Sequence, residues 1–200
     1  GVDNVAVDVA TTRGIPVCNV PDYCIDEVAD HTVALALTLA RQIPFVDRRV
    51  RDKIWKITPP ALMPAFKDMI FATMGFGRIA QAAHRRMQSF GCTSIAHDPF
   101  TSREVLQSAR VAAKPLDEVF AIADILSLHC PLMPETHHLI NTARLRQMKS
   151  TAILINTARG ALVDTVALAQ ALREGTIAAA GLDVFEPEPL PDDHPLRLKY

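Results

Sequence analysis

The sequence has little of several features that would place it in a specialised class. Its 200 residues include only four cysteines, and these form neither a CxxC pair nor a spacing typical of zinc ligands. Lys and Arg number 21 against 22 Asp and Glu, so the formal net charge is -1 and no dense basic run is present to attract nucleic acid or anionic membranes. The longest apolar stretch, Val33 to Ala40, is far shorter than a membrane span, and no signal peptide is recognisable.

These scarcities predict a cytoplasmic globular protein with free thiols and with neither a nucleic-acid nor a membrane partner. The seven histidines form no helical pair with a carboxylate. On a helix or a strand, the adjacent His137 and His138 would point in different directions. No metal site is predicted.

Short apolar runs alternate with segments of helical periodicity along most of the chain. Strands that are apolar on both faces are typical of a parallel sheet covered by helices on each side. The sequence therefore predicts an α/β fold with a doubly wound parallel sheet. The expected strands are Ile70 to Met74, Ser94 to His97, Arg110 to Ala112, Ile125 to Leu128, Ala152 to Ile155 and Ala178 to Asp183.

Two of the expected helices have a clear apolar face. The second of them begins at Asp164, a residue type that favours the N-cap, and ends at Gly175, which favours the conformation that closes a helix. The inward residues are Ile79, Ala83, Met87 and Phe90 in the first helix, and Ala167, Leu168, Ala171 and Leu172 in the second.

The first twenty residues have a different pattern. Short strands are expected at 5–7 and 15–18, around a turn at Arg13-Gly14. A long helix is expected over 25–41, with acidic residues in its first turns and Arg41 at its end, as the helix dipole favours. Pro44 would stop this helix, a second would run over 45–55, and the proline-rich stretch 59–64 would link to the sheet.

A glycine-rich turn follows the first expected strand and opens the first helix. In Gly75-x-Gly77-x-x-Ala80, the first glycine permits a tight turn and the second lets a pyrophosphate approach the backbone, while Ala80 is an accepted small third residue. Asp98 lies at the end of the next strand, where an acid binds ribose hydroxyls and repels the extra phosphate of NADP. The pattern predicts NAD as cofactor, with Asp98 as a simple turn residue before Pro99 as the alternative.

A second polar cluster follows the last two expected strands. Arg159, beside Gly160, is placed to clamp a carboxylate with two hydrogen bonds, although a surface arginine in a loop would give the same pattern. Asp183 ends the next strand and Glu188 follows in a proline-flanked loop. Reduction of a 2-keto acid needs a cation for the carboxylate, a proton donor, and a group that keeps the donor protonated. Arg159 could be the first and Glu188 the third, if it pairs with a histidine.

With these motifs in place, the chain closely resembles the D-isomer-specific 2-hydroxyacid dehydrogenases, in the branch that contains phosphoglycerate-dehydrogenase-like and C-terminal-binding-protein-like members. The resemblance extends over nearly all 200 residues. It is carried by Gly1 to Asn4, Asn19 to Pro21, Glu27 to Thr32, the glycine turn, Leu128 to Leu132, Asn156 to Gly160 and Leu182 to Pro189.

The resemblance implies a role for each site residue. Arg159 would bind the substrate carboxylate and carbonyl, and Glu188 would orient a catalytic histidine. Around the cofactor, Arg78 and Ile79 would contact the pyrophosphate, Asp98 the ribose, and the backbone of Cys130 the adenosine side. The residues implied to bind the cofactor are Thr32, Gly75, Gly77, Arg78, Ile79, Asp98, Cys130, Thr157, Ala158, Arg159 and Asp183, the last on the nicotinamide carboxamide.

The resemblance also implies a division of the chain. Residues 1–20 would be the C-terminal remnant of a substrate-binding domain, 21–190 a Rossmann-type NAD-binding domain, and 191–200 the start of a return segment. The family's catalytic histidine lies in a Pro-His motif that would follow Tyr200, and the Asp192 to Pro195 stretch resembles a polar loop instead.

Two functional hypotheses follow. The first is an NAD-dependent dehydrogenase that transfers a hydride between NAD(H) and a small D-2-hydroxy acid or 2-keto acid. The alternative is an NAD(H)-sensing corepressor of the C-terminal-binding type. The helix over 25–41 has an apolar stripe at Val33, Leu37 and Ala40 that could simply pack in the core. Helices in this region of the family form a two-fold contact, so a homodimer is expected.

Overall fold

The computed structural model of the chain describes residues 5–55 and 64–197, and its centre is a six-stranded sheet. The strand order is β3-β2-β1-β4-β5-β6, and every neighbouring pair is parallel. This is the order of the doubly wound nucleotide-binding fold. Strands are added outward from β1 towards one edge of the sheet and from β4 towards the other, so the order of addition reverses between these two strands. The strands are β1 (Ile70–Met74), β2 (Thr93–His97), β3 (Ala112–Ala113), β4 (Ile125–Leu128), β5 (Ile153–Asn156) and β6 (Ala179–Leu182).

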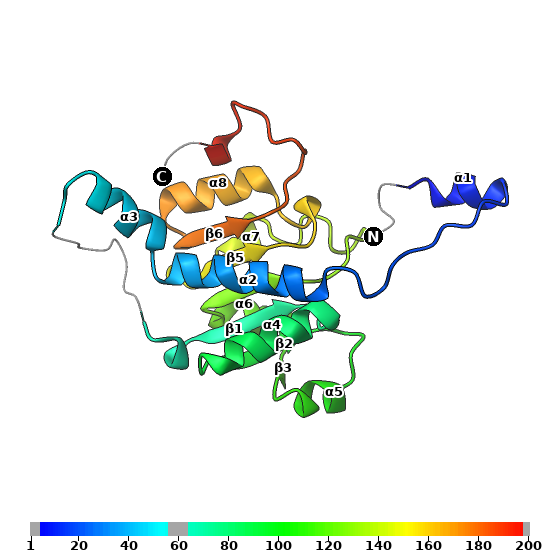
Figure 1. The fold of residues 1–200 in the computed structure, drawn as a ribbon, viewed down its shortest axis with the longest axis horizontal. Coiled ribbons are helices and arrows are strands. Elements are labelled where there is room, and N and C mark those ends of the chain that lie inside the picture. The colour runs from blue at the N-terminus through cyan, green and yellow to red at the C-terminus, as the bar shows by residue number, and fades with distance from the viewer. Residues whose placement is uncertain (1–4, 56–63, 198–200) are drawn as a thin grey trace.

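Helices cover both faces of this sheet. Successive strand residues point to opposite sides, so each central strand contributes side chains to the cores on both faces. Phe71 and Ile153 pack with α2 and α4 on one face, and Ala72 and Leu154 pack with α6 and α8 on the other. Figure 1 shows α2 and α4 lying together across one side of the sheet. The helices are α1 (Val7–Thr12), α2 (Ile25–Ala40), α3 (Ile43–Arg51), α4 (Arg78–Ser89), α5 (Arg103–Ser108), α6 (Leu116–Ile122), α7 (Thr142–Leu145) and α8 (Thr165–Glu174), with 3-10 turns η1 (Phe66–Asp68), η2 (Gly160–Leu162) and η3 (Pro195–Arg197).

The central strands and α8 confirm the predictions most closely. β1 and β4 have the expected bounds, and β2, β5 and β6 differ from them by one residue at one or both ends. The Asp164 carboxylate caps α8 by accepting hydrogen bonds from the backbone N–H groups of Val166 and Ala167. Gly175 closes the same helix with φ +68°. Capping and periodicity together thus located this helix correctly.

Several predictions near element ends were wrong. Residues 7–12 form α1 where a strand was expected at 5–7, and 15–18 form no strand. Pro44 lies in the first turn of α3, where its missing N–H costs no hydrogen bond, and it does not stop α2. β3 is displaced to 112–113 because Arg110 adopts the left-handed conformation, with φ +57°. Phe90 is the C-cap of α4 and is 44% exposed, not part of the inward face.

The segment before α2 lies apart from the body of the fold. α1 buries none of its residues, and Figure 1 shows it well away from the sheet, joined to α2 by an extended stretch. The stripe on α2 is part of the core, since Val33 and Ala40 are buried and Leu37 packs against the same cluster. Most of the expected 59–64 linker lies outside the described residues. No helix in the described part of the chain is long and apolar enough to cross a membrane.

Candidate functional site

The glycine turn leads from β1 into α4 and lies against the backbone that follows β4. Gly75 has φ +91°, and a Cβ built there would lie 2.8 Å from the carbonyl oxygen of His129 and 2.9 Å from the backbone nitrogen of Cys130. Only glycine fits this close backbone approach. A Cβ on Gly77 would meet nothing within 4 Å, so open space lies before the first turn of α4. The first N–H groups of a helix have no partner within the helix, so this turn fits a pyrophosphate.

Asp98 lies directly beside this turn, after β2. Its Oδ2 accepts a hydrogen bond of 2.7 Å from the backbone N–H of Phe76, inside the glycine turn. Its Oδ1 accepts from the N–H groups of Phe100 (2.8 Å) and Thr101 (3.1 Å). Asp98 therefore does act as a turn residue, as the alternative interpretation required, and it also ties β2 to the glycine turn. Oδ2 accepts only the one hydrogen bond from the described residues, so it has a second lone pair with which a ribose hydroxyl could hydrogen-bond.

A cavity of about 580 Å³ opens next to Asp98. Its walls are mostly apolar, and it lies at the carboxyl edge of the sheet, where the doubly wound fold binds ligands. Burial raises the pKa of the Cys130 thiol to about 11, so Cys130 contributes a neutral surface. The size and lining fit the adenosine part of a dinucleotide. The lining residues that come from strand ends and the following loops include Met74, Gly75, Asp98, Cys130, Pro131 and Met133.

The middle of α2 meets the residues that follow β5 and β6. The hydroxyls of Thr32 and Thr157 lie 2.9 Å apart and are buried. The Asp183 N–H donates to the carbonyl oxygen of Asn156 at 3.0 Å, and its carboxylate lies 3.4 Å from His31 Nε2. Three residues expected to surround the nicotinamide are thus brought to one place, although they are far apart in the sequence.

The loop that carries Arg159 is held by Asn156, a residue to which the sequence analysis gave no role. The Asn156 side chain is completely buried. It donates to the Arg159 carbonyl oxygen at 2.8 Å and accepts from the Ala158 N–H at 3.1 Å. Arg159 is half-buried, and its guanidinium donates to the Ala158 carbonyl oxygen at 2.7 Å. In the sequence, Asn156 could have been recognised as a polar residue at the end of an otherwise apolar strand.

Gly160 places this loop against the segment that carries Glu188. A Cβ on Gly160 would lie 1.8 Å from the carbonyl oxygen of Phe185, so the two backbones are in direct contact. Glu188 Oε1 accepts a hydrogen bond of 2.7 Å from the Phe185 N–H, which folds residues 185–188 into a turn. Arg159 and Glu188 therefore belong to two adjoining loops, as their proposed roles require.

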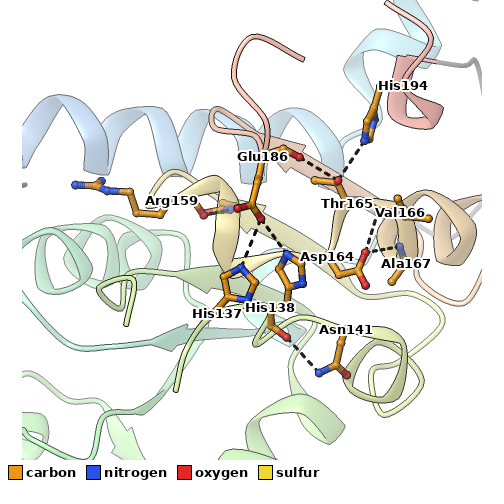
Figure 2. Close-up of polar contacts among 11 residues, drawn as sticks. His137, His138, Asn141, Arg159, Asp164, Thr165, Val166, Ala167, Glu186 and His194 are labelled. Atoms are coloured by element: carbon orange, nitrogen blue, oxygen red, sulfur yellow. Dashed lines mark hydrogen bonds and ion pairs between the residues drawn. The ribbon is translucent and has the colours of Figure 1, made fainter. Parts of the chain in front are cut away.

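Glu186, which the sequence analysis did not single out, is paired with two histidines. Its Oε2 lies 2.9 Å from His138 Nε2 and 3.8 Å from His137 Nε2. The two rings stack with centroids 4.0 Å apart, because they lie in a turn and not on the helix or strand for which different directions were expected. Figure 2 shows both rings directed at Glu186, while the Arg159 side chain extends away from them.

Two residues of the expected pyrophosphate contact have other partners. The Arg78 guanidinium donates to the Pro21 carbonyl oxygen at 3.1 Å and forms an exposed ion pair with Asp22. The Ile79 side chain packs against the core between α2, α4 and the sheet. Ile79 could therefore contact a phosphate only through its backbone N–H. Arg78 would first have to break its exposed ion pair with Asp22, which costs little free energy.

Two histidines lie beneath the glycine turn. His84, on α4, is buried against the rings of Phe71 and Phe76, and its Nε2 lies 3.0 Å from the Thr73 hydroxyl. His129 Nε2 lies 2.9 Å from the Ser127 hydroxyl. Burial lowers the pKa of His84 to about 3 and that of His129 to about 4. Both imidazoles are neutral at physiological pH and act as polar packing groups.

Comparisons with known proteins place this geometry in a family. Residues 33–199 match the model of the D-isomer specific 2-hydroxyacid dehydrogenase, NAD binding domain. A glyoxylate reductase of Korarchaeum cryptofilum is 43% identical over 98% of this chain and 60% of its own length. A D-3-phosphoglycerate dehydrogenase of Mycobacterium tuberculosis is 41% identical over 96% of this chain and 36% of its own length.

A solved structure agrees with these relatives. The D-lactate dehydrogenase of Aquifex aeolicus, complexed with NAD and lactic acid, superposes with a TM-score of 0.89 at 33% identity, over 98% of this chain and 62% of that one. The chain thus spans about 60% or less of the length of these relatives.

Proposed function

Because this chain belongs to the D-isomer specific 2-hydroxyacid dehydrogenase family and carries its NAD-binding domain, we propose that the protein transfers a hydride between NAD(H) and a small D-2-hydroxy acid or 2-keto acid. NAD(H) supplies the hydride acceptor or donor in such a reaction. In our proposal, the residues of this chain bind the dinucleotide, bind the carboxylate of the substrate and support an imidazole that acts as acid and base.

The observation that carries this proposal is the contact between the Arg159 loop and the Glu188 segment. Gly160 seats one backbone on the other at the carboxyl edge of the sheet, next to the hydroxyls of Thr32 and Thr157. A guanidinium in this place can bind a carboxylate with two hydrogen bonds and withdraw charge from the neighbouring carbonyl. In our proposal, Arg159 recognises the part that all 2-hydroxy acids share.

Glu188 and Asp98 complete the assignment. Glu188 would hold an imidazolium acid/base in its charged form and raise its pKa by electrostatic attraction. Asp98 would accept hydrogen bonds from the adenosine ribose and repel a 2′-phosphate, which favours NAD over NADP. Thr157, Ala158 and Asp183 would surround the nicotinamide.

The decisive test is Arg159→Ala in the protein that carries this domain. Loss of the guanidinium removes a charged hydrogen-bond donor from a developing negative charge, so kcat/KM for a 2-keto acid should fall at least about 100-fold. NADH binding, followed by fluorescence, should change little. Arg173→Ala, at an exposed position at the end of α8, is the matched control and should keep wild-type turnover. Unchanged turnover in Arg159→Ala would refute the assignment.

The corepressor alternative finds no support among the relatives described above, which carry the names of enzymes. A panel of 2-keto acids, with NADH absorbance as the readout, distinguishes the two hypotheses. Oxidation of NADH by one or more acids is the result expected for the enzyme. No oxidation by any of them would favour a binding role.

We also propose that the protein is a cytoplasmic homodimer. The thiols of all four cysteines are free, as expected in a reducing compartment. The segment before α2 exposes apolar side chains that a second copy could cover, and these include Val9, Ile15, Val20 and Tyr23.

A further inference from the structure

We propose that His137, His138 and Glu186 form a binding site for one divalent transition-metal ion, and that Zn²⁺ is the ion this donor set fits. Two imidazole nitrogens and one carboxylate are a known set of protein ligands for Zn²⁺. The proposal is independent of hydride transfer and uses none of the residues assigned to it.

The distances between the donor atoms suit a tetrahedral ion. With metal–ligand bonds of about 2.0–2.1 Å, two ligands of a tetrahedral Zn²⁺ lie roughly 3.3 Å apart. Glu186 Oε2 is 2.9 Å from His138 Nε2 and 3.8 Å from His137 Nε2, so both pairs are close to this separation. All three ligand atoms lie within 4.8 Å of one another. Small side-chain rotations would complete the geometry.

The backbone of the 131–139 loop is what brings two adjacent histidines together. His138 adopts the left-handed conformation, with φ +48°, which is uncommon for a residue with a side chain. Its ring thereby stacks on that of His137 at an interplanar angle of 23°, and both face the same carboxylate (Figure 2). The His138 N–H donates to the Ala161 carbonyl oxygen at 2.8 Å, and its carbonyl oxygen accepts from the Asn141 side chain at 3.2 Å. The backbone N–H and the carbonyl oxygen of His138 are thus both held by hydrogen bonds.

Glu186 is anchored from the opposite side. Its backbone follows Phe185, whose carbonyl lies against Gly160. Its own carbonyl oxygen accepts a hydrogen bond of 3.3 Å from the Thr165 hydroxyl, at the start of α8. Both ligand segments therefore rest on residues 160–165, so the ligands are positioned before any ion binds. Preorganisation of this kind reduces the entropy that binding must overcome.

The surroundings of the site leave room for ion and solvent. The side chains of His137, His138 and Glu186 are 51%, 40% and 42% exposed. In the described part of the chain, the ion-pair partners of Glu186 are these two histidines, with no lysine or arginine among them. Water can therefore supply the remaining ligand of a tetrahedral ion, as in zinc sites with three protein ligands.

Binding would join two loops of different roles. Residues 131–139 include Pro131, Met133 and Thr136, which line the cavity beside Asp98, whereas Glu186 lies on the segment that leads to Glu188. An ion held by both would link the wall of the cofactor cavity to the acid-bearing loop. We therefore expect metal binding to raise the melting temperature of the chain.

The test is metal titration of the chain after removal of bound ions with a chelator. Isothermal titration with Zn²⁺ should give one ion per chain for the wild type. Co²⁺ should give visible d–d absorption without the near-ultraviolet charge-transfer band that thiolate ligands produce. Glu186→Gln and His138→Ala should each weaken Zn²⁺ binding at least about tenfold. His31→Ala removes an exposed histidine beside another acid and should bind Zn²⁺ like the wild type.

The melting temperature of each variant without metal shows whether it is folded, because half-exposed side chains should cost little stability. Zn²⁺ should then raise the melting temperature of the wild type and of His31→Ala, and leave that of a His138→Ala/Glu186→Gln double variant unchanged. The proposal is overturned if the wild type binds no stoichiometric Zn²⁺, if these substitutions leave the affinity unchanged, or if Co²⁺ reports thiolate ligands.

Discussion

At the scale of single residues, His84 shows how a buried polar group makes stability depend on pH. It is enclosed by Phe71 and Phe76 and bonded to the Thr73 hydroxyl. Its folded pKa, about 3, lies below the value of 6.5 for an unperturbed histidine because burial disfavours the imidazolium. Between these two values the unfolded chain binds a proton that the folded chain does not. The contribution of His84 to the free energy of unfolding is therefore fully present above about pH 6.5 and is lost as the pH falls towards 3.

We predict that His84→Gln, which keeps a polar group beside Thr73, removes this dependence. Between about pH 5.5 and 4.5, the unfolding free energy of the wild type should fall more steeply than that of the variant, by roughly 1.4 kcal/mol per pH unit. Urea denaturation at a series of pH values measures both slopes. Above about pH 7.5 the two curves should run parallel, which is the internal control. Equal slopes below pH 5.5 would show that His84 titrates normally in the folded chain.

Residue types predicted members of the candidate site but not how they are held. The glycine turn, Asp98 and Arg159 were predicted because each has a local pattern that the proposed chemistry requires. The hydrogen bond between Thr32 and Thr157, and the amide bonds of Asn156 to its loop, depend on tertiary contacts that no local pattern encodes. The stacking of His137 on His138 was missed because it needs a loop with φ +48°, and only helix and strand geometries were considered.

At the scale of elements, α8 is positioned by its N-cap. Asp164 Oδ1 accepts hydrogen bonds of 3.1 and 2.9 Å from the first free N–H groups of the helix. This helix packs Leu168 and Ala171 on the sheet and presents Thr165 to the Glu186 backbone. Its start therefore influences both the core and the loop beyond β6.

Asp164→Ala should lower the free energy of unfolding by about 1 kcal/mol, because two helical N–H groups lose their acceptor. Asp164→Asn keeps a capping oxygen and should remain within a few tenths of a kcal/mol of the wild type. Chemical denaturation followed by circular dichroism measures both. If the alanine variant matched the asparagine variant, the side chain would have no capping role.

Elements in the interior were predictable, whereas those at the edge were not. β1 and β4 are short, mostly apolar runs, and such a pattern predicts a central strand of a parallel sheet that is buried on both faces. β3 is a two-residue exposed edge strand, so neither burial nor periodicity marks its position. α1 contains Val7 and Val9, which favour strands by propensity, but propensity is a weak guide where a segment packs against nothing.

At the scale of the whole molecule, the exposed segment before α2 is the feature that suggests a second copy. Ile15, Val20 and Tyr23 are 55%, 73% and 75% exposed, and the segment lies away from the sheet. We predict that sedimentation equilibrium gives a mass of twice 21.9 kDa for the wild type.

An Ile15→Glu/Val20→Glu double variant should weaken this association at least about tenfold, because it would place charges in an apolar contact. Val166→Glu, at an apolar position of α8 that is 63% exposed, is the matched control and should leave the mass unchanged. A wild-type mass of 21.9 kDa at micromolar concentration would refute the homodimer.

The close approach of Gly160 to Phe185 has a consequence for how such a site can change over evolutionary time. The contact is between the backbones of two loops of the same chain. The placement of Arg159 beside the Glu188 loop therefore does not depend on which side chains occupy positions 185 and 186. We expect substitutions at positions 185 and 186 to leave the two loops in contact as long as Gly160 remains. A side chain with a new function can therefore appear at position 186 without moving Arg159 away from the loop that carries Glu188.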